Sequence, residues 1–324
     1  MWYHYNDEIC EEFISFEKEE CKIINLKLIR ENGDVKFKAY GEEIDEHFHG
    51  EYEEGDRFKI EVPYGNFLTV QLDPTLKPAL IYLPDGVFEF AIPFGRERSM
   101  CYAKGAFAGD DHRIVVSEPT DAEIYGERMI SSNSHDRHKV PKYFPHAAAN
   151  FVTREEPSFF ERNAIDGVCD NSSHGAYPYH SWGGGLREDL EFWVDFGMPV
   201  EVSRVVIFLR ADFPHDTYWK EMDIEFSDGT KIHKDLIGTA DGQEITFEPK
   251  VTESVKLTGF KQQRLEDGSL SFAALSQIEI YGKYIKQENK GMEVRDAANA
   301  KDVRYYTTDR LREEFHIGNL FTKD

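Results

Sequence analysis

The sequence predicts an all-β protein that consists of two β-sandwich (jelly-roll) domains and a short helical C-terminal tail. Three observations support this fold class. Up to about residue 285, short runs rich in Val, Ile, Phe and Tyr alternate with polar residues, which is the period of a half-buried strand. Turn signals that contain Gly, Pro, Asn or Asp separate these runs. After Lys283 the alternation ends and a helical spacing appears.

The first domain is expected over residues 1–130. Its strand candidates, all within residues 21–92, are CKIINLKLIR, VKFKAY, RFKIEV, FLTVQL and VFEFAI. Between two of them, the segment 41–56 carries eight carboxylates and no Lys or Arg. Such a charge run is typical of a solvated face or sheet edge, which is the favoured interpretation, and cation binding is the alternative.

Residues 131–161 are expected to form a linker that packs on the second domain, because alternation is lost there and histidines and prolines gather. A long ordered loop of this kind often supplies side chains to a site. Strands return over 162–285, the second domain. In VSRVVIFLR (202–210) the residues that would point to either face of a strand are apolar, which predicts a strand buried on both faces. In MDIEF (222–226) apolar and polar residues alternate, which predicts a half-exposed strand.

Composition excludes several classes of protein. The 324 residues include 38 Lys plus Arg and 61 Asp plus Glu, a net charge of −23, which should repel nucleic acid and anionic membrane surfaces. The apolar fraction of 40% and the aromatic fraction of 14% indicate a folded chain. We expect neither nucleic acid nor membrane as a partner, and the sequence leaves open whether the chain forms a homo-oligomer.

The cysteines and the start of the chain favour a cytoplasmic location. Cys10, Cys21, Cys101 and Cys169 form no zinc-type spacing, which is typical of reduced, unligated thiols. The acidic start lacks the basic and apolar stretches of a secretory signal, and no apolar run of about 18 residues occurs.

Residues of about 160–284 resemble a discoidin or coagulation-factor type C domain, the galactose-binding-like sandwich of many carbohydrate-binding modules. The resemblance rests on Ala164-Ile165-Asp166-Gly167, on Trp182, on Asp195-Phe196-Gly197, on FSDG at 226–229 and on IEIYG at 278–282. The strings HG-x-YP and RADFPHD-x-YW resemble a bacterial subgroup. This resemblance implies a galactose-binding-like fold for the second domain and a carbohydrate as the ligand.

The tail, residues 286–324, is expected to be an appendage. Its segment 292–324 resembles the amino terminus of 5-keto-4-deoxyuronate isomerase, with a helix predicted near Thr308 that places Leu311 and Phe315 on one face and ends at Gly318. The metal-binding cupin region of that family would lie downstream, so isomerase chemistry is not expected here. The resemblance instead implies a connection with uronate catabolism.

Two loops of the second domain carry the side chains that sugar recognition needs: aromatic rings for the C–H face of a pyranose, and polar groups for its hydroxyls. An arginine could also pair with the carboxylate of a uronate. Two alternatives stay open: Trp182 as a core residue, and an internal salt bridge of Arg210 with Asp212 or Asp216. The candidate contacts are His174, His180, Trp182 and Arg187 in loop 169–187, and Arg210, Asp212, His215, Asp216 and Trp219 in loop 210–219.

The resemblance further implies a structural Ca²⁺ near the Ala-x-Asp-Gly entry. The matching oxygen ligands are Asp166, Asn171, Ser173 and Glu279. A separate pair, His47 and His49, should share one face of a strand, which is a zinc-ligand geometry without an evident third ligand.

These patterns predict a protein that binds a sugar, with a uronate as the specific expectation. The alternative is an enzyme, a lyase or hydrolase of uronate-derived oligosaccharides, in which His215, Asp216 and His174 serve as acid–base groups. A third hypothesis is a non-catalytic structural or oligomerising protein.

Overall fold

A computed structural model describes residues 23–62, 66–211 and 217–286. The described residues up to Ile285 belong to one compact unit. The predicted helical tail lies outside the described residues. All pairs of neighbouring strands are antiparallel, and only two short α-helices occur in the described part, so the predicted all-β class is confirmed. No helix among the described residues is long and apolar enough to cross a membrane.

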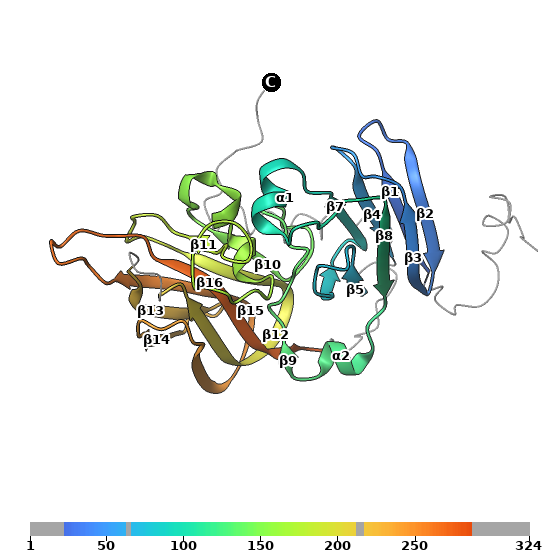
Figure 1. Ribbon diagram of the computed structural model, residues 1–324. Coiled ribbons are helices and arrows are strands. Elements are labelled where there is room, and N and C mark those ends of the chain that lie inside the picture. The colour runs from blue at the N-terminus through green and yellow to red at the C-terminus, as the bar shows by residue number, and fades with distance from the viewer. Residues whose placement is uncertain (1–22, 63–65, 212–216, 287–324) are drawn as a thin grey trace, which may run out of the picture. The chain divides into compact units, whose positions relative to one another are not determined.

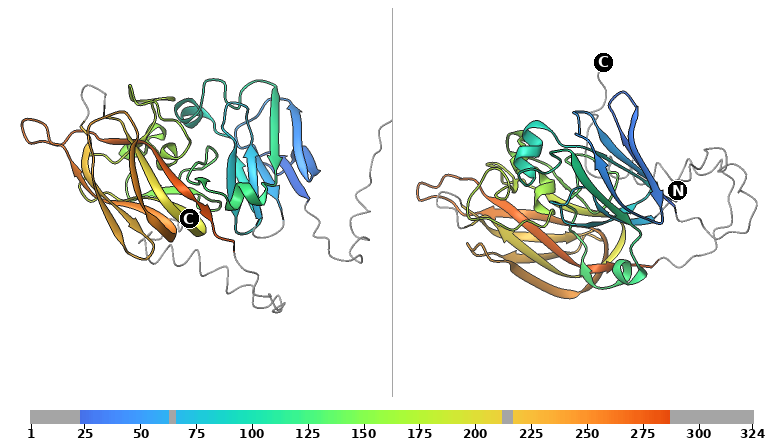
Figure 2. Two further views of the ribbon diagram at one scale, coloured as in Figure 1. Left: turned by 90° about the horizontal axis from the view of Figure 1, so that it is seen from below. Right: turned by 45° about the vertical axis from the view of Figure 1, so that its right-hand side comes forward.

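The first sandwich consists of two four-stranded sheets (Figures 1 and 2). One sheet has the order β2-β1-β4-β7, with bounds Val35–Gly41, Ile24–Ile29, Arg57–Glu61 and Val87–Ala91. The other has the order β3-β8-β5-β6, with bounds Glu43–His49, Asp111–Ser117, Asn66–Gln71 and Ala79–Leu83. Helix α1 is Gly95–Cys101, and α2 is Asp121–Tyr125.

The alternation predicted for the first sandwich appears in its burial pattern. Ile24, Leu26 and Leu28 are fully buried on β1, and the residues between them are partly exposed. On β3 only Ile44 and Phe48 are buried, so most of its side chains face solvent. This exposure agrees with the solvated sheet face predicted for the acidic segment 41–56.

The second sandwich is formed from one continuous sheet with the order β11-β16-β12-β15-β13-β14; β10 also pairs with β12, and β9 with β16. These strands are β9 Arg128–Met129, β10 His146–Ala149, β11 Trp182–Gly183, β12 Phe192–Leu209, β13 Trp219–Phe226, β14 Lys231–Asp235, β15 Gln243–Gln262 and β16 Ala274–Tyr284. Register shifts interrupt the pairing of β12 with β15, which bends the sheet around an apolar core.

The segment 131–161 contacts both sandwiches: Phe144 exchanges two backbone hydrogen bonds with Tyr82 of the first, and Tyr143 is buried in the core of the first. It also contacts the second sandwich. The backbone of Ile130 donates to Ile280, and that of Asn133 donates to Ile165. Within and after this segment lie the 3₁₀ helices η2 Thr153–Glu155, η3 Pro157–Phe159 and η4 Glu161–Ala164. They bring side chains from the predicted linker to one end of the sandwich. The proposed domain boundaries, 1–130, 131–161, 162–285 and 286–324, stay predictions.

Candidate functional site

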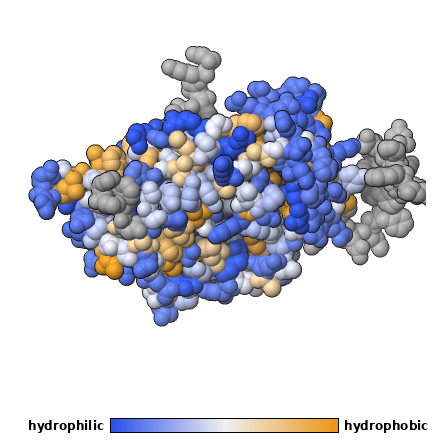
Figure 3. Space-filling model, in the orientation of Figure 1, coloured by the Kyte–Doolittle hydropathy of each residue, from blue (hydrophilic) through white to orange (hydrophobic). Residues whose placement is uncertain are grey.

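A pocket of about 320 Å³ opens among loops at one end of the second sandwich. It brings together two predicted contacts, His174 and Arg210, with side chains from η2, η3 and the loop between β15 and β16. Figure 3 shows hydrophobic surface at the end where that last loop projects. The pocket is lined by Thr153, Arg154, Phe159, His174, Gly183, Arg210, Ser271, Phe272, Ala273 and Ala274.

Arg210 places a permanent positive charge at this pocket. It follows Leu209, the last residue of β12, and its backbone N–H donates to the carbonyl of Ala274 at 3.1 Å. The residue is only 4% exposed. Because a guanidinium stays protonated and presents its N–H groups as a planar fork, a buried arginine at a pocket suits a carboxylate ligand.

Phe272 supplies an exposed aromatic ring to the same pocket. It is 45% exposed, whereas Phe159 beneath the pocket is 8% exposed. The backbone N–H of Thr217 donates to the carbonyl of Phe272 at 3.2 Å, which anchors the loop. An exposed ring beside polar groups is the arrangement that packs against the C–H face of a sugar.

Arg154 adds a second cation at the rim. It and Glu155 have φ values of 56° and 46°, the left-handed region that non-glycine residues rarely adopt. Strain of this kind tends to gather at functional sites. The guanidinium carbon of Arg154 lies 5.5 Å from the ring centroid of Phe159, and its Nε lies 3.4 Å from Glu156.

Two predicted contacts, Trp182 and Trp219, are core residues instead. They are 0% and 1% exposed, and their ring centroids lie 5.5 Å apart. The indole N–H of Trp182 donates to the carbonyl of Phe151 at 3.0 Å. Both indoles are enclosed by other aromatic rings, such as Phe260, so the core alternative for Trp182 holds and no ligand reaches either ring.

His180 is also buried and pairs with Asp166 rather than facing a ligand. Its Nε2 lies 2.5 Å from Oδ2 of Asp166, and NH1 of Arg162 lies 3.8 Å from the same oxygen. The ring of Tyr177 stacks on His180 with centroids 5.2 Å apart. This cluster braces the loop 169–181 from inside.

Arg187 does not line the pocket. Its Nε and NH2 donate to the two carboxylate oxygens of Asp189 at 2.8 and 2.5 Å, and these bonds hold the pKa of Asp189 below its usual value. Its guanidinium carbon lies 5.0 Å from the ring centroid of Phe151. The remaining predicted contacts of loop 210–219, Asp212, His215 and Asp216, lie outside the described residues, as does most of the alternative acid–base set.

Three of the four predicted calcium ligands, Asp166, Asn171 and Glu279, are engaged by other groups of the protein. Asp166 is engaged by His180 and accepts the backbone N–H of Val168, while the side-chain amide of Asn171 donates to the carbonyls of Leu209 and Ala240. Glu279 accepts the phenol of Tyr281. The side-chain amide of Asn171, which donates its N–H₂ group to two backbone carbonyls, therefore braces the loop. The fourth predicted ligand is Ser173.

His47 and His49 share a face of β3 as predicted, and both contact one carboxylate. Their Nδ1 atoms lie 2.9 and 3.4 Å from Oδ1 of Asp111. Across residues 23–62, 66–211 and 217–286, however, no group of three or more His, Cys, Asp and Glu side chains is arranged to hold a metal ion.

Comparisons with known proteins find similarity over parts of the chain. No family model matches. The 4-deoxy-L-threo-5-hexosulose-uronate ketol-isomerase of Lachnoclostridium phytofermentans is 70% identical over 30 residues, which is 9% of this chain and 11% of that enzyme. The chain therefore spans about a tenth of the length of the curated relative that it matches.

Solved structures match about half of the chain. The family 32 carbohydrate-binding module of C. perfringens NanJ, in complex with galactose, is 17% identical, covers 48% of this chain and 98% of its own, and has a TM-score of 0.34. The chitosan-binding module 1 of a Paenibacillus sp. IK-5 chitosanase/glucanase is 18% identical, covers 48% and 99%, and has a TM-score of 0.32. Both resemblances stated from the sequence are confirmed as resemblances; no activity follows from them.

Proposed function

We propose that the protein binds a sugar, specifically a uronate, in the pocket lined by Arg210, His174 and Phe272. The observation that carries the proposal is the convergence of a buried guanidinium and an exposed aromatic ring at one pocket. The ring provides a surface for the pyranose, and the guanidinium provides paired donors for a carboxylate. The volume of about 320 Å³ lies at the lower end of the range of small-molecule sites, which suits one or two sugar rings.

The remaining lining residues support the same ligand class. Arg154 lies at the rim, where it is ion-paired with Glu156, and no carboxylate is among the described lining residues. In a chain with a net charge of −23, two arginines and no acidic side chain among the described lining residues of a pocket favour an anion as the ligand. His174, an exposed residue, supplies donor or acceptor capacity for a hydroxyl.

Calorimetric titration of the full chain with galacturonate and galactose tests the proposal. Galacturonate should bind at least tenfold more tightly, because galactose lacks the carboxylate that pairs with Arg210. Arg210→Gln should remove this preference, and Phe272→Ala should weaken both sugars. Arg187→Gln is the matched control, since Arg187 lies outside the pocket.

Two outcomes would contradict the proposal. Equal affinity for galactose and galacturonate would show that no carboxylate contact forms. Unchanged galacturonate binding in a folded Phe272→Ala variant would place the site elsewhere. Turnover of an unsaturated uronide by the same preparation would assign the pocket to an enzyme, which is the alternative that His174 leaves open.

A further inference from the structure

The carboxylate of Glu156 lies between two arginines from distant parts of the chain. Its Oε2 is 3.4 Å from Nε of Arg154, at the rim of the pocket, and its Oε1 is 3.1 Å from NH2 of Arg96 on α1. The side chain of Glu156 is 22% exposed, whereas those of Arg154 and Arg96 are 68% and 69% exposed. One partly buried carboxylate is therefore shared by two guanidinium groups, which leaves one net positive charge in this cluster.

Helix α1, which carries Arg96, is fixed against the loops beside the pocket. The carbonyl of Met100 accepts the backbone N–H of Tyr177 at 2.8 Å, and the thiol of Cys101 donates to the carbonyl of Pro157 at 3.0 Å. Pro157 begins η3, the residue after Glu156. Cys101 is 2% exposed and belongs to the core of the first sandwich. The helix therefore presents Arg96 to η3 from a fixed position.

The turn that carries Arg154 needs such support. The positive φ values of Arg154 and Glu155 are a backbone conformation that persists only where surrounding contacts hold it. Each of the two carboxylates that follow Arg154 is paired with a cation from another segment: Glu155 with Lys139 at 2.8 Å, and Glu156 with Arg96. These pairs fix the turn at the rim of the pocket.

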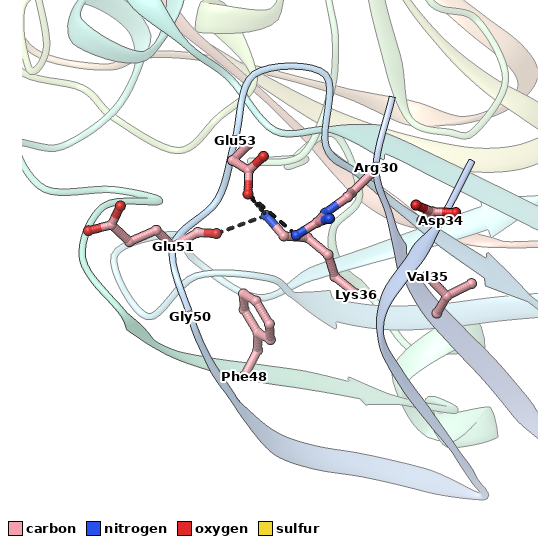
Figure 4. Close-up of a pocket in the computed structure, with 8 residues that line it drawn as sticks. All are labelled: Arg30, Asp34, Val35, Lys36, Phe48, Gly50, Glu51 and Glu53. Carbon is pink, nitrogen blue, oxygen red and sulfur yellow. Dashed lines mark hydrogen bonds and ion pairs between the residues drawn. The ribbon is translucent and has the colours of Figure 1, made fainter. Parts of the chain in front are cut away.

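A hollow beside β2 shows a shared carboxylate in the opposite charge balance (Figure 4). The hollow has a volume of about 730 Å³, and its lining residues include two cations and three carboxylates. Glu53 lies 3.0 Å from Nζ of Lys36 and 3.6 Å from NH2 of Arg30, and Lys36 also donates to Asp56 at 2.7 Å. Carboxylates outnumber cations in the lining, so the hollow does not favour an anion. In the cluster around Glu156, by contrast, the two arginines outnumber the carboxylate.

We infer that Arg96 is a positioning residue for the pocket: by pairing with Glu156, it weakens the hold of that carboxylate on Arg154 and leaves Arg154 to the carboxylate of the ligand. The inference rests on the proposed function for its ligand. Glu156 and the ligand compete for the same guanidinium, because a charge-assisted hydrogen bond to one carboxylate uses donors that the other needs. Arg96 is not among the lining residues of the pocket, so it acts through Glu156. A helix of the first sandwich thereby sets the affinity of a pocket in the second.

Calorimetric titration of the full chain with galacturonate in about 0.15 M salt tests the inference. Arg96→Gln should raise the dissociation constant about threefold, which is the scale of an exposed ion pair, and Arg96→Lys should restore most of the affinity. Glu156→Gln should lower the dissociation constant severalfold, because Arg154 then has no competing carboxylate. In the Glu156→Gln background, Arg96→Gln should have little further effect, because the charge of Arg96 itself is screened over about 8 Å at this salt concentration.

Two controls separate this role from a general change in charge or folding. Lys104→Gln removes one exposed positive charge shortly after the same helix and should bind galacturonate as wild type does. Galactose, which lacks a carboxylate, should bind Arg96→Gln and wild type equally. Circular dichroism checks that each variant is folded.

The outcomes distinguish this inference from the proposed function. A wild type that does not prefer galacturonate to galactose would contradict the proposed function, and the inference with it. A wild type with that preference and an Arg96→Gln variant of equal affinity would overturn the inference and leave the pocket intact. Equal weakening of both sugars in Arg96→Gln, or the same loss with and without Glu156, would also overturn it, because Arg96 would then only support the fold of the turn.

Discussion

The imidazole Nε2 of His180 lies 2.5 Å from the carboxylate Oδ2 of Asp166, and both side chains are at least 95% buried. This pair joins the Ala-x-Asp-Gly entry of the second sandwich to the end of the loop that carries His174. Arg162 approaches the same carboxylate at 3.8 Å. The contact fixes the loop beside the pocket from within the protein, and it turns two residues predicted to meet a ligand or a metal into a brace.

Asp166→Asn should therefore lower the free energy of unfolding by about 3–5 kcal/mol, because it leaves the buried His180 and Arg162 without their carboxylate. Urea denaturation followed by fluorescence measures the change. Asp189→Asn is the matched control: it breaks the exposed pair with Arg187 and should cost less than about 1 kcal/mol. Equal losses in the two variants would show that the buried pair is not a brace.

Substitutions of Trp182 should affect the free energy of unfolding, whereas substitution of Phe272 should affect sugar binding. Trp182→Ala empties a fully buried position and should cost about 3–5 kcal/mol, whereas Phe272→Ala changes a ring that is 45% exposed and should cost little. The folded variant Trp182→Phe should keep sugar binding, and Phe272→Ala should lose it. Loss of sugar binding in a stable Trp182→Phe variant would return Trp182 to the site.

His135 should make the protein less stable in acid. Burial lowers the pKa of its imidazole to about 3, and its Nε2 accepts the backbone N–H of Leu72, which requires the neutral ring. The unfolded chain takes up a proton near pH 6.5 and the folded chain does not, so stability is complete above about pH 6.5 and declines as the pH falls toward 3.

The slope due to His135 should approach 1.4 kcal/mol per pH unit below about pH 6. Urea denaturation at intervals between pH 7.5 and 4.5 measures it. His135→Gln, which keeps an acceptor for Leu72, should flatten this part of the profile. An unchanged slope in that variant would assign the acid sensitivity to other groups.

Calcium should leave the melting temperature unchanged. Asp166 and Asn171 are engaged within the protein, so no oxygen cage is open to the ion. Differential scanning fluorimetry in about 5 mM calcium, and separately in about 5 mM EDTA, measures the melting temperature. An ion that binds only the folded state raises the melting temperature by mass action. A clear upward shift with calcium, reversed by EDTA, would restore the predicted site.

Alternation of apolar residues was sufficient to predict most strands. The segment MDIEF buries Met222, Ile224 and Phe226, as its period requires. VSRVVIFLR was expected as a strand, but its residues 202–209 form only the second part of β12, which begins at Phe192. The two parts of β12 are continuous because β15 pairs with both across a register shift between Asp195 and Val200, an arrangement that depends on a partner remote in sequence.

The site was only partly predictable. Arg210 was found from its place directly after an apolar strand, and His174 was found from the aromatic and polar side chains of loop 169–187. Phe272 and Arg154 were missed, because neither lies in an alternating run and each reaches the pocket through loops that the fold brings together. The one available signal for Arg154 was the long polar linker itself. Whether an indole is a platform or a core residue depends on what surrounds it, so the sequence left both interpretations of Trp182 open.

The segment before Arg162 supplies two strands and a wall of the pocket to the second sandwich, and this determines which fragment of the chain could be transferred to another protein as a complete domain. A fragment that began at Arg162 would lose β9 and β10, which pair with β16 and β12, and with them the pocket wall formed by Thr153, Arg154 and Phe159. The portion that could recombine as a working whole therefore begins no later than Arg128. The second sandwich of this chain is therefore longer than residues 160–284, the region that the resemblance stated from the sequence covers.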